Sequence, residues 1–119
     1  MSYQKYGNKS IVVNGIKFQS KLESERYEQL MLLERAGEIS GLKLQLGLQI
    51  NPPWTNPYTG TKLKGSMYYA DFFYIDNRNN KMIIEDTKGV ETDVFRLKWN
   101  LVRSLYPQYE FRKVTRDEV

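Results

Sequence analysis

Hydrophobic residues in the first part of the chain follow two patterns, one typical of a β-hairpin and one typical of a helix. Residues 11–18 place β-branched and apolar side chains on both sides of Asn14-Gly15, a pattern typical of a β-hairpin. A helix is predicted from Ser20 to about Ala36, since Ser20 and the glutamate three residues on resemble a capping box and Gly37 follows the last turn. Its apolar stripe has roughly helical spacing and consists of Leu22, Tyr27, Leu30 and Leu33.

The remaining chain predicts three strands, a helix and a final strand. Apolar residues alternate over 39–50, and further apolar segments near 67–76 and 81–87 read as two neighbouring strands. Residues 51–65 hold three of the four prolines and two glycines, which predicts a long loop. A second helix should begin at Thr92 or Asp93, end near Tyr106 before Pro107, and be followed by a strand over 109–114. Its expected buried side comprises Phe95, Leu97, Leu101, Val102 and Leu105.

This order of elements predicts one α/β domain over residues 1–119, with an N-terminal hairpin. The first nine residues are expected to be loosely held. No apolar run approaches the length of a membrane span and no secretory signal opens the chain, so a cytoplasmic location is expected.

The composition removes several classes of chemistry. The chain has no cysteine and no histidine, which excludes a disulfide framework, a thiolate nucleophile, Ser-His catalysis and histidine- or cysteine-bound zinc. Hydrolysis would then need carboxylates, lysine, tyrosine or a metal bound by oxygen. The 18 basic and 14 acidic residues give a net charge of +4, which moderately favours a polyanionic partner.

Two acids lie inside apolar strands, where an uncompensated charge is costly. Asp71 lies in the first of the two neighbouring strands, and Asp86 and Lys88 lie two apart on the second, so both point to one side of it. The plain alternatives are an edge-strand charge for Asp71 and a solvent-facing ion pair for the other two. The chemical interpretation is that the two acids bind Mg²⁺ or Mn²⁺, with the Thr87 carbonyl as a further ligand. The metal would polarise a phosphate and lower the pKa of a water, while Lys88 stabilises developing negative charge.

Asp71 followed fifteen residues later by Asp86-x-Lys88 resembles the PD-(D/E)xK nuclease superfamily. The upstream Ser20-x-x-Glu23 resembles that superfamily's first-helix motif, and the resemblance covers roughly residues 17–114. It implies the restriction-endonuclease-like αβββαβ core, a mixed four-stranded sheet with helices on both of its sides. It also implies a metal site that Glu23 joins, with Glu25 as the alternative. Glu23 also has a purely structural explanation as the capping-box glutamate. The sequence departs from the motif at Ala70, in place of proline.

The strings Tyr69-Ala70-Asp71-Phe72 and Glu85-Asp86-Thr87-Lys88-Gly89 are similar to those of small phage-encoded members related to Holliday junction resolvases. Glu85 offers another carboxylate, but its spacing to Lys88 does not fit the motif, which favours Asp86. The likeness implies a Mg²⁺-dependent DNA endonuclease of phage or prophage origin, acting on branched DNA in the host cytoplasm as a homodimer. Two alternatives remain: a DNA-binding accessory protein with a vestigial nuclease site, and a nicking or restriction-like endonuclease that cuts linear duplex.

Several polar and aromatic residues are candidate DNA contacts, although a solvated surface is an adequate explanation of the basic ones. Trp54 and Tyr58 in the long loop, together with a nearby lysine pair, make it a candidate flap over DNA; the alternative is a surface loop packed by Trp54. Relatives within the superfamily often place a glutamine of the first core strand near the site. The DNA-contact candidates are Gln45, Lys62, Lys64, Arg96 and Lys98.

Overall fold

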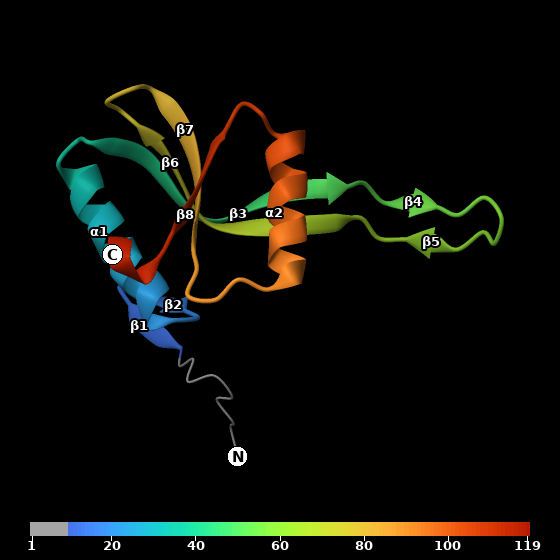
Figure 1. Ribbon diagram of the computed structural model, residues 1–119, viewed down its shortest axis with the longest axis horizontal. Coiled ribbons are helices and arrows are strands. Elements are labelled where there is room, and N and C mark those ends of the chain that lie inside the picture. The colour runs from blue at the N-terminus through green and yellow to red at the C-terminus, as the bar shows by residue number, and fades with distance from the viewer. Residues whose placement is uncertain (1–9) are drawn as a thin grey trace, which may run out of the picture.

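The structure is a computed structural model that describes residues 10–119, so the prediction about the first nine residues lies outside the described part (Figure 1). The elements follow the predicted order, with two additions: a pair of short strands between the third and sixth strands, and a 3₁₀ turn at the end. They are β1 (Ile11–Val13), β2 (Ile16–Phe18), α1 (Lys21–Arg35), β3 (Ile39–Asn51), β4 (Trp54–Thr55), β5 (Lys62–Leu63), β6 (Ser66–Asp76), β7 (Lys81–Thr87), α2 (Asp93–Leu105), β8 (Glu110–Val114) and the 3₁₀ turn η1 (Arg116–Glu118).

The central sheet has four strands in the order β3-β6-β7-β8. The first two pairings are antiparallel and β7 pairs with β8 in parallel, the connection between them running through α2. Buried residues divide into one cluster shared with α1 and another shared with α2. The predicted α/β fold, a mixed four-stranded sheet with helices on both sides and an N-terminal strand pair, is therefore confirmed.

Helix α1 begins and ends where the sequence predicted. The Ser20 hydroxyl accepts the Glu23 backbone N–H at 3.1 Å, which satisfies one of the free donors of the first turn. Gly37 follows the helix with φ +78°, in the left-handed region that favours glycine. Tyr27 and Leu30 are buried against the sheet, whereas Leu33 lies partly at the surface.

Helix α2 buries only part of the predicted face. Val102 is buried and Phe95 packs against the same cluster, as predicted. Trp99, which was not predicted, is also buried, and its ring packs edge-on against Tyr68 and Phe111. Both the observed and the predicted face have helical spacing, so periodicity alone cannot choose between them; the large aromatic ring gains more by burial than the leucines do. The prediction that Leu97, Leu101 and Leu105 face the core is wrong, since they are 64, 40 and 48% exposed.

The apolar side chains of β3 pack on the α1 side of the sheet in its first half and on the α2 side in its second half. Leu42 and Leu44 of β3 pack on the α1 side, whereas Leu46 and Ile50 pack on the α2 side. The change falls at Gln45, which has φ +53° and so interrupts the regular alternation of the strand. The β6 residue between the pairs Leu44–Phe72 and Leu46–Ala70 is Asp71. The irregularity therefore lies at the residues that carry the candidate chemistry.

Residues 51–65, predicted as a long loop, form an ordered hairpin arm at the far end of β3 and β6, in which β4 and β5 pair (Figure 1). At its base the backbone approaches too closely for a side chain, since a Cβ on Gly65 would lie 2.4 Å from the Asn51 carbonyl oxygen. The Ser66 hydroxyl donates to the Asn51 side-chain oxygen beside it. The arm is thus fixed to the sheet at its neck.

Candidate functional site

Asp71 and Asp86 meet where the ladder between β6 and β7 ends. Its last backbone pair is Phe72–Glu85, and beyond it carboxylates replace carbonyls as acceptors. The Asp71 N–H donates to Asp86 Oδ1 at 2.8 Å, and the Thr87 N–H donates to Asp71 Oδ2 at 2.9 Å. The Thr87 hydroxyl adds a third bond to Asp71 Oδ2 at 3.0 Å. The two acids are therefore held in place by the strands that carry them.

Glu23 comes to the same place from the first turn of α1. Its carboxylate accepts from the Gln45 side-chain amide at 3.3 Å, and the same nitrogen donates to Asp71 Oδ1 at 3.4 Å. The bond to the Ser20 hydroxyl is made by the Glu23 backbone, so capping leaves the carboxylate available for this contact. Between the two glutamates considered from sequence, Glu23 is the one that shares a hydrogen-bond partner with Asp71, and Glu25 has no such bond.

The electrostatics of this group are those of crowded carboxylates. Burial, then the charges of Asp71 and Asp86, raise the pKa of Glu23 to about 7. Burial raises the pKa of Asp86 to about 6 despite the hydrogen bond from Asp71 and the charge of Lys88. The pKa of Asp71 is also raised by burial, against the opposing effect of the bonds from Thr87. A positive charge placed here would relieve an unfavourable arrangement.

Lys88 faces the carboxylates without pairing directly with any of them. Its charge lowers the pKa of Glu23, Asp71 and Asp86, yet within residues 10–119 its amine makes no ion pair closer than 4.0 Å. The amine lies 4.3 Å from the centre of the Phe95 ring on α2, a cation–π contact. The lysine is thus held close to the group with its hydrogen-bonding capacity unused by the acids.

Glu85 points away from this group, which favours Asp86 as the second acid of the motif. It is fully buried and receives two bonds from the Arg26 guanidinium, at 2.7 and 2.8 Å. The Tyr74 hydroxyl donates to it at 2.6 Å. This ion pair joins α1 to β7 one position from Asp86 and three from Glu23, so it fixes the two elements that supply these carboxylates.

The donor chemistry fits a hard cation, although the carboxylates are not arranged around one. Carboxylate oxygens are the ligands that Mg²⁺ and Mn²⁺ prefer. In the described part of the chain, no three acidic residues are spaced to enclose a metal ion. The reason is local: one oxygen each of Asp71 and Asp86 accepts backbone N–H groups, and the Gln45 amide bonds both Glu23 and Asp71. The role of the Thr87 carbonyl as a ligand stays a prediction.

The candidate DNA contacts are divided between the site and its surroundings. Gln45 is part of the site, and Lys62 and Lys64 lie on the hairpin arm. Arg96 on α2 is engaged with Asp93 at 2.8 Å, while Lys98 is half-buried on the same helix. Of the five candidate DNA contacts, Gln45 is therefore the one that the structure places beside the acids.

Three contributors were not foreseen from sequence. The Thr87 hydroxyl, the Phe95 ring and the Arg26 guanidinium each hold a site residue or its element in place. For Arg26 a signal did exist, because an arginine three residues after Glu23 on the buried side of a helix needs a buried acid as partner.

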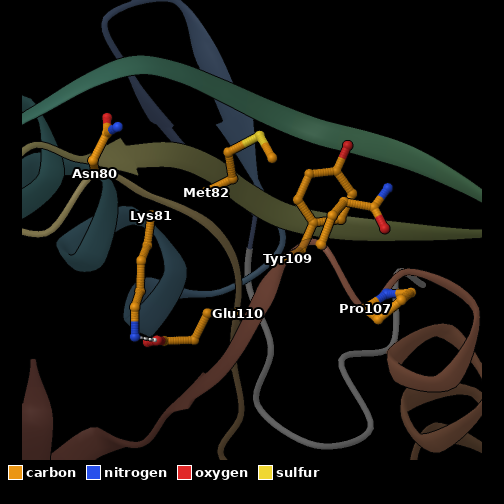
Figure 2. Close-up of a pocket in the computed structure, with 7 residues that line it drawn as sticks. Asn80, Lys81, Met82, Pro107, Tyr109 and Glu110 are labelled. Atoms are coloured by element: carbon orange, nitrogen blue, oxygen red, sulfur yellow. Dashed lines mark hydrogen bonds and ion pairs between the residues drawn. The ribbon is translucent and has the colours of Figure 1, made fainter.

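A separate cavity of about 330 Å³ lies at the opposite end of β7 and β8 (Figure 2). Lys81 and Glu110 on its wall form an ion pair at 3.2 Å, and Tyr109, Pro107 and Met82 supply apolar surface. Asp86 is five positions along the strand from Lys81, a rise of roughly 17 Å, so this cavity is not part of the carboxylate group.

No helix in residues 10–119 is both long enough and apolar enough to cross a membrane. Residues 3–118 match the family described as Protein of unknown function (DUF1064), and the chain belongs to that family. No curated protein and no solved structure matches the chain.

Proposed function

We propose that this member of the DUF1064 family is a metal-dependent DNA endonuclease that hydrolyses phosphodiester bonds. One observation carries the proposal: Glu23, Asp71 and Asp86 come from three separate elements and gather beside Lys88. Burying three mutually repelling carboxylates lowers stability, and such an arrangement is typical of a site that binds a cation. The resemblance to PD-(D/E)xK nucleases gives the same four residues the same roles.

Each residue has a task in this scheme. Asp71 and Asp86, whose carboxylates are oriented by backbone N–H groups, would hold Mg²⁺ or Mn²⁺, and Glu23 would complete the set. A cation held there would supply charge neutralisation at a phosphate and a lowered pKa for a water molecule. The Gln45 amide would have to give up its bonds to Glu23 and Asp71 to free these carboxylates for the cation. Lys88, which forms no ion pair with an acid of residues 10–119, would stabilise negative charge that develops on the phosphate.

Branched DNA is the substrate that the resemblance favours, and a homodimer would supply the two cuts that junction resolution needs. The test uses purified protein with an end-labelled four-way junction, a linear duplex of matching sequence and a single strand, in Mg²⁺ or in EDTA. Paired symmetric cuts in the junction support resolution. Cutting of the linear duplex supports a nicking or restriction-like enzyme, and binding without any cutting supports a vestigial site.

Two variants separate the site from general effects of charge. Asp71→Asn should abolish cleavage while DNA binding persists, because the amide no longer neutralises a cation. Asp93→Asn removes an acid of the same type from a fully exposed position and should cleave as the wild type does. Equal activity in all three proteins would show that the carboxylate group is not the nuclease site.

A further inference from the structure

The segment that runs from the candidate site to the arm is free of acidic residues. Between Glu38 and Asp71 the chain has three lysines (Lys43, Lys62 and Lys64) and no aspartate or glutamate. These 32 positions therefore carry +3 of the net charge of +4. Such a one-sided distribution is expected of a surface that meets a polyanion.

Between Asp71 and the arm, one face of the β3–β6 pair is exposed to solvent. Its other face is buried against α2 through Leu48 and Tyr68. On the open face Tyr69 is 58% exposed and Met67 is also exposed, and both lie over Gly47, where a Cβ would be 3.0–3.1 Å from their side chains. Tyr69 is two residues from Asp71. An aromatic surface thus begins beside the carboxylates; we call Gly47, Met67 and Tyr69 the ribbon face.

The arm beyond the ribbon face is ordered and presents aromatic rings to solvent. Asn56 closes its tip, since its N–H donates to the Thr61 carbonyl and its own carbonyl accepts from Gly60, both at 2.8 Å. The Asn56 side chain accepts the Tyr58 N–H at 2.9 Å. Tyr58 is nevertheless 95% exposed, and Trp54 at the arm's base is 49% exposed. The tip is shaped by its own hydrogen bonds and holds a ring with no partner in the described chain.

We propose that the ribbon face and the arm bind nucleic acid strands whose bases are unpaired, by stacking bases on Tyr69, Trp54 and Tyr58. The positive charge of this segment favours a polyanion as the partner. Only two lysines lie on the arm, however, and the third, Lys43, lies over the Phe73 ring. Phosphate contacts are therefore few, and affinity has to come from the rings. Rings stack on exposed base faces, which a continuous duplex hides within its own stack.

This inference deepens the proposed function by naming what lets the enzyme distinguish a branched or single-stranded region from duplex. The cleavage that follows binding rests on the proposed function, whereas the binding itself does not. A second copy of this chain could also bind the ribbon face, because β3 is an edge strand of the sheet and its free edge can pair with another strand. Charge speaks against that occupant, since the ribbon face and arm of one copy offer no acid to the lysines of another.

The experiment measures binding in EDTA, apart from any cleavage, by anisotropy of fluorescein-labelled oligothymidine and of a fully paired duplex of equal length. The wild type should bind the single strand more tightly. Tyr58→Ala and Tyr69→Ala should each weaken that binding about tenfold, within the range for one lost stack. Tyr69→Phe should restore it, because the ring remains. Leu32→Ala, which removes an exposed apolar side chain from α1, should change nothing.

Salt dependence gives an independent reading of the same surface. Lys62→Ala should lower the slope of log affinity against log salt by about 0.7, the value for one phosphate contact on a single strand. Lys17→Ala removes an exposed lysine on β2 and should leave the slope unchanged.

Three outcomes would overturn the inference. The first is equal binding of duplex and single strand with no effect of the tyrosines. The second is absence of single-strand binding in a protein that cleaves DNA in Mg²⁺. The third is a dimer that sediments as such in the wild type and dissociates in Tyr69→Ala, which would assign the face to a second copy. Ring-dependent binding without cleavage in Mg²⁺ would support the inference and count against the proposed nuclease.

Discussion

Replacing Glu23 by glutamine should make the metal-free protein more stable at alkaline pH. Burial and two neighbouring acids raise the pKa of Glu23 from 4.5 to about 7. At about 1.4 kcal/mol for each pH unit, the rise from 4.5 to about 7 amounts to about 3 kcal/mol. Relaxation of the surrounding groups and entry of water on ionisation reduce that figure to about 2 kcal/mol. Glutamine keeps an acceptor for the Gln45 amide but carries no charge, so the variant avoids this loss.

The sign follows from where the proton is held. In the unfolded chain Glu23 titrates near its ordinary pKa, whereas in the folded protein it keeps its proton up to about pH 7. Its contribution to stability is therefore fully present below about pH 4.5 and is lost as the pH rises through 7. The two proteins should have similar unfolding free energies at pH 4.5, and Glu23→Gln should exceed the wild type by about 2 kcal/mol at pH 8.

The assay is urea unfolding in EDTA between pH 4.5 and 8, followed by tryptophan fluorescence, with the slope m compared between proteins. Glu28→Gln is the control, because it removes a glutamate from an exposed position of the same helix and should leave the pH profile unchanged. A Glu23→Gln protein that is less stable than the wild type at pH 8, or a constant difference at every pH, would refute the picture of crowded carboxylates.

Three further changes test other parts of the structure. Arg26→Met leaves Glu85 buried without its guanidinium and should cost about 3–4 kcal/mol of unfolding free energy. Arg96→Met removes the exposed pair with Asp93 and should cost less than about 1 kcal/mol, so equal costs in denaturant titrations would contradict the buried pair. Gly65→Ala puts a Cβ 2.4 Å from a backbone oxygen, so the arm's neck should shift and trypsin should cut the arm faster; an unchanged cleavage rate would argue against a fixed neck. Lys88→Ala should lower turnover in the DNA cleavage assay by 10²-fold or more while the metal concentration at half-maximal rate changes little, and normal turnover would remove its assigned role.

The elements could be predicted because their signals are local. Ser20 and Gly37 mark the ends of α1 through backbone chemistry that acts within a few residues, and Thr92 does the same for the start of α2. Alternation of apolar residues placed β3 correctly for the same reason. The order of the elements then left few ways to arrange a mixed sheet with helices on both faces.

What could not be predicted depends on tertiary contacts. The face that α2 buries is decided by Tyr68 and Phe111, which lie on other strands and give no signal within the helix. The left-handed conformation of Gln45 has no marker in its residue type, since glutamine seldom adopts it. The arm was predicted as a loop because its strands are two residues each, shorter than any period can reveal.

The candidate site divides in the same way. Asp71, Asp86 and Lys88 were proposed because their spacing along the chain, and the resemblance to a known motif, depend on sequence alone. Their supports are different: Thr87 binds Asp71 across strands, and Phe95 lies under Lys88 from α2. The first contact arises where the β6–β7 ladder ends and the second from the placement of α2, and only the folded chain has either feature.

The most direct test of the central claim is the location of Mn²⁺ in crystals of the protein by anomalous scattering. Mn²⁺ shares the oxygen preference of Mg²⁺ and gives a signal that water cannot mimic. We expect a peak in contact with carboxylate oxygens of Asp71 and Asp86, with Glu23 joining them and the Gln45 amide turned away. A well-occupied peak elsewhere in the molecule would contradict the account if the present hydrogen bonds persisted, with Gln45 bonded to Glu23 and Asp71, and the Asp71 N–H bonded to Asp86.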